Sequence, residues 1–203
     1  MTIFLWAVFC YLLGSVSFAI VLAKCFNMAD PRTYGSKNPG TTNMLRSGRK
    51  GIAALTLLGD SLKGFLPLMA AKHFADFSFD ILTLLALCAF LGHVYPIFFK
   101  FKGGKGVATF IGCMFALNPI AGLVAITTWF IIALITRFSS LASMLSSVLA
   151  CVSLVFMQPN RSFVATTCLA TMVVLLIVKH KTNIRALHAR TESKLFARTD
   201  APN

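Results

Sequence analysis

The chain alternates between long apolar runs and short polar segments, and the apolar runs have the length of membrane spans. A helix needs about 20 predominantly apolar residues to cross the hydrocarbon core of a bilayer. Four runs reach or approach this length, and the second contains two charged residues; they lie at 3–23, 52–71, 81–99 and 162–178. The pattern therefore predicts an all-α integral membrane protein.

The middle of the chain needs a division. Residues 106–136 carry no charged residue and are too long for one ordinary span. Asn118-Pro119 lies near the centre, and proline breaks a helix while asparagine favours the turn before it. We therefore expect two short helices, roughly 107–117 and 119–136, and a further span at 139–157 that is closed by Gln158-Pro159-Asn160. The result is about seven transmembrane helices. A single helix over 106–136 would leave six, and five remain if the last two apolar runs are not both full crossings.

The basic residues orient these helices. Only 12% of the residues are charged and 57% are hydrophobic, yet the formal net charge is +13. Basic residues gather in the segments 24–50 and 98–106 and in the tail 179–203. Because positively charged loops stay in the cytosol, we expect these three segments and the C-terminus to be cytosolic and the N-terminus to lie outside. The chain 1–203 then forms one membrane-embedded domain.

Composition also limits the partners and cofactors. Long apolar runs separate the basic clusters, so the charge indicates a lipid bilayer or an anionic substrate and not nucleic acid. None of the six cysteines forms a C-x-x-C pair, and the four histidines show no metal-ligand spacing. We therefore expect no bound metal.

The segment 35–46 is the first candidate for chemistry. It reads Gly-Ser-Lys-Asn-Pro-Gly-Thr-Thr-Asn-Met-Leu-Arg and combines glycines, hydroxyls, amides and two cations. Exposed backbone N–H groups, hydroxyls and cations together are what a phosphate dianion requires. On composition alone, an ordinary cytosolic loop with basic flanks fits about as well.

A second candidate is the segment 100–109, Lys-Phe-Lys-Gly-Gly-Lys-Gly-Val-Ala-Thr. Glycine permits close approach to backbone amides at the start of a helix, which favours an anion site. The segment is not the nucleotide-binding P-loop, which requires G-x-x-x-x-G-K-[ST]. The alternative is a flexible turn whose lysines face lipid head groups.

Further polar residues accompany the last, second and sixth spans. His180 and Asn183 follow the last span and share a helical face, and histidine is the usual proton carrier near neutral pH. Asp60 and Lys63 lie within the second span, where ionisable residues are costly and by default functional. Ser140 and its neighbours begin the sixth span, where serines also commonly cap helices. Neither G-x-S-x-G nor H-x-x-x-x-D occurs, so two common acyl-transfer motifs are absent from the sequence.

In this order and spacing, the motifs resemble those of the acyl-phosphate:glycerol-3-phosphate acyltransferases, the bacterial PlsY family. The similarity runs nearly from end to end, through Gly14-Ser15, G-S-K-N-P-G-T-T-N at 35–43, Leu45-Arg46, G-D-S-L-K-G at 59–64, G-H-V-Y-P at 92–96, F-K-G-G-K-G-V-A-T at 101–109, Ser140-Leu141-Ala142-Ser143 and the tail from His180 to Glu192. The chain departs from the pattern at Ser17, Lys37 and Arg190, where many members have Pro, Gly and Gly.

The resemblance implies an enzyme of the bacterial inner membrane with seven helices. Such an enzyme transfers a fatty acyl group from acyl-phosphate to the 1-hydroxyl of sn-glycerol 3-phosphate, which gives 1-acylglycerol 3-phosphate (lysophosphatidate) and inorganic phosphate. No cofactor is implied, and an enzyme that produces acyl-phosphate is the implied partner. The residues expected to act in catalysis are Lys105, His180 and Asn183. Those expected to bind substrate are Ser36, Asn38, Gly40, Thr41, Thr42, Asn43, Arg46, Asp60, Lys63, Gly103, Gly104, Gly106, Ser140, Ser143 and Glu192.

The chemistry divides this set between two phosphates. We expect the amides of 103–106, Lys105 and Ser36 to hold the phosphate of acyl-phosphate, and Arg46, Asn43, His180 and Asn183 to hold glycerol 3-phosphate. Acyl-phosphate is already activated, so positioning and charge stabilisation suffice without a strong protein nucleophile. The attacking hydroxyl loses its proton to His180 or to a substrate phosphate oxygen, and the sequence does not separate these two acceptors.

Two other classes compete with the enzyme. A small permease for an anionic metabolite should show repeated halves and polar residues at the midplane. No clear repeat is visible, and only the second span carries an acid–base pair. A non-catalytic lipid-binding protein would not need Asp60, Lys63 and the glycine-rich loops together.

Overall fold

The computed structural model describes residues 1–158 and 162–195, and no β-strand occurs within these ranges. The predicted turn at Pro159-Asn160 and the end of the tail, 196–203, lie outside the described residues. Helices follow one another along the chain as α1 (Thr2–Gly14), α2 (Phe18–Cys25), α3 (Thr41–Arg46), α4 (Lys50–Phe74), α5 (Phe79–Val94), the 3-10 helix η1 (Ile97–Phe99), α6 (Val107–Leu117), α7 (Pro119–Thr136), α8 (Ser139–Met157), α9 (Phe163–Lys179) and α10 (Lys181–His188). The predicted all-α fold is confirmed.

The charge-free stretch divides where the sequence predicted. α6 ends at Leu117, and α7 begins at Pro119. The side-chain oxygen of Asn118 caps α7 by accepting hydrogen bonds from the backbone N–H groups of Ile120 (2.8 Å) and Ala121 (3.3 Å). Proline suits the first helical position because its missing N–H has no intrahelical partner there. Asn118 is therefore the N-cap of α7, and Pro119 is its first helical residue.

The helices differ in how far they reach. Within the described ranges, four helical segments are long and apolar enough to cross a membrane: α4, Phe79–Phe99, α7 and α8. The bent pairs α1–α2 and α9–α10 raise this number to six if each pair is one span. α6 has 11 residues, which corresponds to about 16 Å, roughly half of the hydrocarbon core. Of the seven predicted spans, four thus have the length to cross within the described residues, or six if each bent pair is one span, and α6 is a short helix.

The first predicted span, 3–23, is broken. α1 ends at Gly14 and α2 begins at Phe18, and the two axes differ by 46°. Gly14 lies directly on the backbone of Ala89 in α5, where a Cβ atom would clash. Small residues allow such close approach between membrane helices. The sequence suggested one continuous helix here because Gly-Ser-Val-Ser at 14–17 contains neither a charged residue nor a proline that would mark a break.

Small residues also bring α4 and α6 together. A Cβ atom at Gly64 would meet the carbonyl of Thr109, and one at Gly112 would meet the carbonyl of Ser61. Around this contact the interior is filled by large apolar side chains, including Phe90, Phe110 and Met114. The outer surface is apolar as well and exposes residues such as Phe130, Ile131, Leu134, Phe156 and Phe163. A molecule that is apolar both inside and outside is a multi-pass membrane protein.

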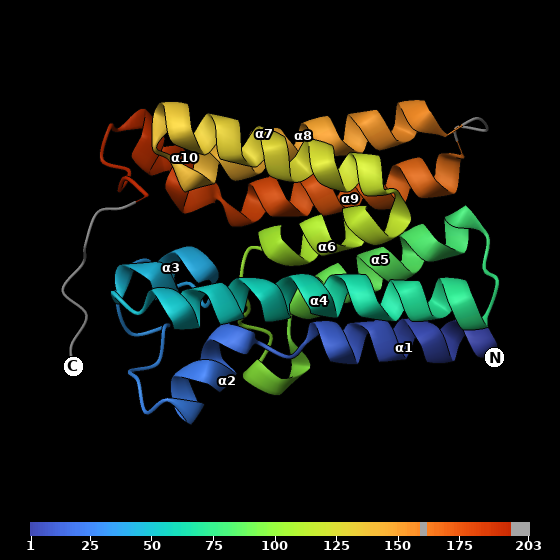
Figure 1. Cartoon of the computed structure of the whole chain (residues 1–203), viewed down its shortest axis with the longest axis horizontal. Coiled ribbons are helices and arrows are strands. Elements are labelled where there is room, and N and C mark those ends of the chain that lie inside the picture. Colours follow the sequence, from blue (N-terminus) through green and yellow to red (C-terminus); the bar gives the residue numbers. More distant parts are fainter. Residues whose placement is uncertain (159–161, 196–203) are drawn as a thin grey trace.

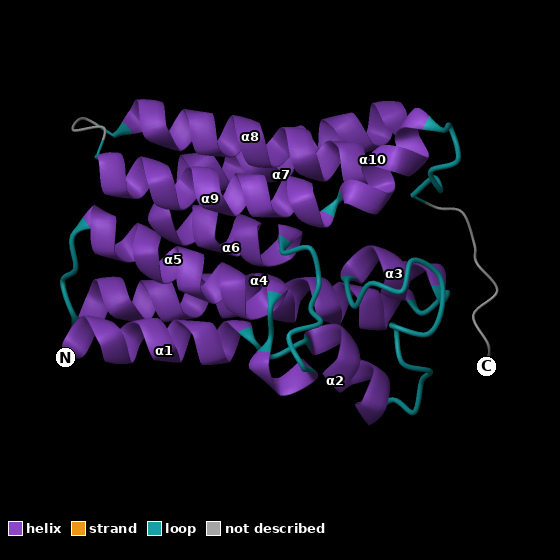
Figure 2. Cartoon of the chain, turned by 180° about the vertical axis from the view of Figure 1, so that it is seen from behind, coloured by secondary structure: helices purple, strands orange, loops and turns teal. Residues whose placement is uncertain are grey.

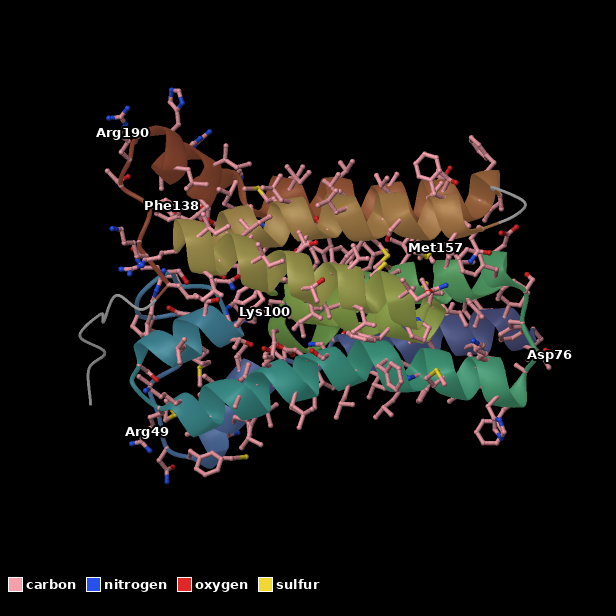
Figure 3. All side chains as sticks on the ribbon, turned by 45° about the horizontal axis from the view of Figure 1, so that its top comes forward. Arg49, Asp76, Lys100, Phe138, Met157 and Arg190 are labelled. Carbon is pink, nitrogen blue, oxygen red and sulfur yellow. The ribbon has the colours of Figure 1, made fainter. Side chains whose placement is uncertain are left out.

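Three of the short helices lie at one end of the bundle. α2, α3 and α10 lie together at the left in Figure 1 and at the right in the reverse view of Figure 2, and the N-terminus lies at the opposite end in both. Arg49 and Arg190 extend at the first end in Figure 3, and Asp76 lies at the other. The segment 24–50 and the described tail therefore lie at the end opposite Met1, and Lys100 of the segment 98–106 lies nearer the middle of the bundle. We call this end of the bundle the basic end.

Candidate active site

Four predicted site residues form a chain of hydrogen bonds at the basic end. Lys105 Nζ donates to Asn183 Oδ1 (2.5 Å), and Asn183 Nδ2 donates to Glu192 Oε1 (2.7 Å). Ser140 Oγ donates to the same carboxylate oxygen (2.7 Å). We call Lys105, Asn183, Glu192 and Ser140 the polar chain. It unites the loop before α6, helix α10, the tail and the start of α8, which are far apart in sequence.

Arg46 reaches the same tail from α3. Its Nη2 donates to the backbone carbonyl of Ser193 at 3.4 Å, a long hydrogen bond. Its Nε is buried and has no hydrogen-bond partner in the described part of the chain. A buried donor of this kind is costly unless something accepts from it. The guanidinium therefore has donor capacity left for an anion beside Glu192.

The charge state of Lys105 depends on its surroundings in the site. Partial burial lowers the pKa of Lys105 to about 8, the carboxylate of Glu192 opposes this shift, and the positive charge of Arg46 adds to it. A phosphate dianion would remove the repulsion and restore the charged form. The site is thus partly desolvated, and its two cations, Lys105 and Arg46, have the charge to bind an anion.

His180 lies directly beyond α9 and is buried. Its Nδ1 is 2.8 Å from the carbonyl oxygen of Leu176, which can only accept, so Nδ1 carries the hydrogen and Nε2 keeps the lone pair. Burial and the charge of Lys105 lower the pKa of His180 to about 4, although the hydrogen bond to Leu176 acts in the opposite direction. The imidazole is therefore neutral at pH 7, the form that can accept a proton.

Asn43 supports the segment 35–46 from within. Its side-chain oxygen accepts from the backbone N–H of Ser36 (3.0 Å), and its Nδ2 donates to the carbonyls of Pro31 (2.7 Å) and Tyr34 (3.3 Å). The side chain is almost fully buried. All three hydrogen bonds go to backbone of the same loop, so Asn43 fixes the loop conformation. We had expected it to face glycerol 3-phosphate.

The other predicted residues of this loop are more accessible. Thr42 Oγ1 lies 3.2 Å from Ser139 Oγ and so joins α3 to the start of α8. Gly40 is the last residue before α3, and Thr41 is the first residue in it. Ser36 is exposed and Asn38 is half-buried. Neither of these two side chains has a hydrogen-bond partner among the described residues, so both are available to a ligand at the basic end.

The glycines of the segment 100–109 allow the loop to pack closely against α5. A Cβ atom at Gly104 would meet the imidazole of His93, and one at Gly103 would meet the backbone carbonyl of His93. Gly106 has a φ of +88°, which disfavours any residue with a side chain. A Cβ atom at Gly106 would also overlap the ring of Phe90. The N–H of Gly104 donates to the carbonyl of His93 at 3.2 Å. The backbone N–H of Gly104 is therefore not free to bind an anion. Of the amides of 103–106 that we expected to bind the donor phosphate, those of Gly103, Lys105 and Gly106 remain.

Asp60 and Lys63 close the break in the first span. Lys63 Nζ donates to Asp60 Oδ1 (2.7 Å) and to the carbonyl of Val16 (2.6 Å). Asp60 Oδ1 accepts a long hydrogen bond from the N–H of Phe18 (3.5 Å), and Thr109 Oγ1 donates to the carbonyl of Asp60 (2.9 Å). Backbone groups freed inside a membrane need such partners. The pair thus supplies polar partners to both sides of the break.

Ser143 has a packing role in this structure. Its hydroxyl donates to the carbonyl of Ser139 (2.7 Å) and accepts from Trp129 Nε1 (3.1 Å), which joins α8 to α7. It therefore lies beside the polar chain without being part of it.

His93 is a residue that sequence reasoning missed. It is buried, its Nδ1 lies 3.8 Å from Asp60 Oδ1 without a hydrogen-bond partner in the described ranges, and its ring and carbonyl support Gly103 and Gly104. It thereby connects the Asp60–Lys63 pair to the loop that carries Lys105. The motif G-H-V-Y-P contains it, but among the histidines we had given a role in catalysis or substrate binding to His180 alone.

Comparison with known proteins places these observations in a family. The family model described as glycerol-3-phosphate acyltransferase matches residues 4–190. A protein of Burkholderia thailandensis named glycerol-3-phosphate acyltransferase is 47% identical over 99% of this chain and 100% of its own length. A protein of Burkholderia pseudomallei with the same name is 47% identical over 96% of both chains.

The fold is similar to that of solved structures. The crystal structure of PlsY (YgiH), an integral membrane glycerol 3-phosphate acyltransferase, in its glycerol 3-phosphate form matches with a TM-score of 0.89 and 36% identity over 96% of both chains. Its lysophosphatidic acid form matches with a TM-score of 0.86 and 36% identity over 96% of this chain and 95% of that one. Sequence, fold and the order of the polar motifs agree, and this chain belongs to the glycerol-3-phosphate acyltransferase family, of the PlsY type.

Proposed function

We propose that the chain transfers a fatty acyl group from acyl-phosphate to the 1-hydroxyl of sn-glycerol 3-phosphate. The products are 1-acylglycerol 3-phosphate and inorganic phosphate, and the reaction is the first step of phospholipid synthesis. The observation that carries the proposal is the polar chain at the basic end, which joins Lys105 to Asn183, Glu192 and Ser140 beside the neutral His180. Family membership supports the acceptor substrate.

The reaction requires one bond to form and one to break. The 1-hydroxyl oxygen of glycerol 3-phosphate attacks the acyl carbonyl carbon, and the bond from this carbon to the phosphate oxygen breaks. Inorganic phosphate leaves with the electron pair, and the hydroxyl proton goes to His180 Nε2 or to a phosphate oxygen. Phosphate is a good leaving group, so the protein has to position two anions and stabilise their charge.

The cations and amides divide between the two phosphates. Lys105 and the amides of Gly103, Lys105 and Gly106 suit the donor phosphate, because these amides have no protein acceptor among the described residues. Arg46, with its unpartnered Nε, suits the phosphate of glycerol 3-phosphate. Asn183 accepts a hydrogen bond from Lys105 and holds this side chain until an anion takes its place. The chain needs no metal or other cofactor for these steps.

Purified protein tests the reaction directly. Phosphate release should require both acyl-phosphate and glycerol 3-phosphate, and acyl-CoA should not replace acyl-phosphate. Lys105→Ala protein serves as the matched control for non-enzymatic hydrolysis. Release that does not depend on glycerol 3-phosphate, or equal activity with acyl-CoA, would contradict the proposed donor and acceptor. Uptake of glycerol 3-phosphate into proteoliposomes without acylation would favour the permease.

We also propose that the basic end is cytosolic, that Met1 lies outside, and that the membrane is the bacterial inner membrane. The basic segments 24–50 and 98–106 and residues 179–195 lie in the half of the bundle away from Met1, and positive loops stay in the cytosol. An enzyme that produces acyl-phosphate would then supply the donor from the same side. Single-cysteine labelling in a cysteine-free background tests the orientation. Labelling of position 190 only from the outside would reverse it.

A further inference from the structure

The chain reverses direction after α10 and crosses back over the basic end. Arg190 adopts a left-handed conformation (φ 57°), and the N–H of Thr191 donates to the carbonyl of Ala186 at 2.8 Å, which ends the helix. The next residues return toward α8 and α3, where Glu192 and Ser193 make the contacts described above. We call residues 191–195 the strap. The family model ends at residue 190, just before it.

Leu195 is the point where the strap is fixed. Its side chain is 8% exposed and packs with Ala133 of α7 and Ala142 of α8, with Trp129 and Ile132 beside them. Its backbone N–H donates to the carbonyl of Arg137 at 2.8 Å. Among residues 181–195, Leu195 alone is buried. The two alanines leave room for a large apolar side chain between α7 and α8, and Leu195 fills it.

The strap carries two groups of the candidate site. Glu192 Oε1 accepts from both Ser140 and Asn183, and the carbonyl of Ser193 accepts from Arg46. Neither residue is buried, so these contacts order a segment that is otherwise exposed. Ordering an exposed segment costs conformational entropy for each residue. An apolar anchor two residues after Ser193 offsets this cost at the end of the strap.

We propose that Leu195 is a positioning residue for the glycerol 3-phosphate half of the site. By anchoring the strap it holds Glu192 against Asn183 and Ser140, and so fixes Asn183 relative to Lys105. The inference rests on the proposed function, because its test measures the KM values of that reaction. It goes beyond the proposed function by giving a role to a residue that we place outside both substrate sites. Loss of the anchor frees Glu192 and leaves Asn183 and Arg46 without their fixed acceptors. The consequence is weaker binding of glycerol 3-phosphate.

The test compares Leu195→Ala with Leu195→Met and with the exposed control Lys194→Ala. Leu195→Ala should raise the KM for glycerol 3-phosphate about tenfold, a factor equivalent to about 1.4 kcal/mol, while the KM for acyl-phosphate changes less. Leu195→Met should restore near-normal values because methionine fills the same space. Lys194→Ala should have no effect. Ala133→Leu occupies the same space from α7 and should reproduce the rise in KM with the tail unchanged, which keeps the test valid if Leu195→Ala folds poorly.

A double-mutant cycle separates positioning from general destabilisation. If Leu195 acts through Glu192, Leu195→Ala should add little to the effect of Glu192→Gln. Multiplicative losses in the double variant, or an unchanged KM in folded Leu195→Ala and Ala133→Leu proteins, would overturn the inference. Both results require an active wild-type protein. A wild-type protein that does not use acyl-phosphate would instead contradict the proposed function, so the two failures are distinguishable.

Discussion

Lys105 Nζ and Asn183 Oδ1 share a hydrogen bond of 2.5 Å that joins residues 78 positions apart in the sequence. The bond occupies the cation that the proposed reaction needs. An anion that binds Lys105 must therefore compete with the amide of Asn183, which remains held to Glu192 by its other end. We therefore expect Asn183 to hold Lys105 in place until a substrate phosphate displaces its side-chain oxygen.

Replacing Lys105 with Ala should remove a direct charge contact to the donor phosphate. We expect a loss of about 3 kcal/mol or more in transition-state stabilisation, measured as kcat/KM for acyl-phosphate. Lys102→Ala is the matched control, because Lys102 is an exposed lysine of the same loop. Small and equal losses in both variants would show that the loop is not a phosphate site.

The affinity for the donor phosphate should depend on pH through Lys105. Its pKa in the free protein is about 8, so the ammonium is present below pH 8 and is lost as the pH rises above it. The KM for acyl-phosphate should therefore rise between pH 7 and pH 9.5. Lys105→Arg, whose guanidinium stays charged in this range, should show a flat profile whatever its absolute activity. A rise of the same size in the Arg variant would assign the titration to another group.

His180 should act without protonation above pH 5, because its pKa is lowered to about 4. If it accepts the hydroxyl proton, His180→Gln should lower kcat about 100- to 10,000-fold with little change in KM. A role in binding predicts a raised KM for glycerol 3-phosphate with kcat retained. An acidic limb near pH 6 that persists in His180→Gln belongs to a substrate phosphate, whose second pKa is about 6. Near-normal kcat and KM in this variant would leave the substrate phosphate as the proton acceptor.

Asp60 and Lys63 should matter first for folding. Each single variant, Asp60→Asn or Lys63→Met, leaves a buried charge and one side of the α1–α2 break without its partner. Breaking a buried pair typically costs about 3–5 kcal/mol, and removing both partners costs less than the sum. Thermal unfolding in detergent measures this. Single variants with an unchanged Tm and no activity would instead assign the pair to catalysis or substrate binding.

Gly104→Ala should displace the loop that carries Lys105, because the new Cβ would overlap the imidazole of His93. Overpacking of this kind typically costs about 1–3 kcal/mol, and we expect it to appear in kcat/KM for acyl-phosphate. Adding His93→Ala makes room for the methyl group, so the double variant should lose less than the two single losses combined. Gly51→Ala is the control, since a Cβ atom there meets open space. Additive losses would mean that His93 does not set the loop position.

Much of the fold followed from the spacing of apolar and charged residues. The division at Asn118-Pro119 was predictable because both residues act locally, one as a cap and the other as the first helical residue. The break after Gly14 was not, since the groups that contact it belong to other helices: Gly14 lies against the backbone of Ala89, and Lys63 donates to the carbonyl of Val16. The sequence marked Asp60 and Lys63 as costly inside a membrane, but their partners at Val16 and Phe18 become apparent only in three dimensions.

The site was predictable at the level of segments and less so at the level of contacts. Residues of the three polar stretches do meet, as the topology implied. The orientation of Asn43 into its own loop was not expected, because composition does not say which side of a loop an amide faces. The return of the tail through Leu195 was also missed, since a single leucine in a polar segment gives no periodic signal.

The break in the first span has a consequence for how the chain is made. Synthesis delivers α1 and α2 to the membrane before the residues that satisfy the carbonyl of Val16, since Lys63 follows 47 positions later. Until α4 arrives, the segment around Val16 has unpaired backbone groups that hydrocarbon does not tolerate. The first span therefore reaches its bent form only once α4 lies beside it. The shape of an early helix thus depends on a residue that is synthesised 47 positions later.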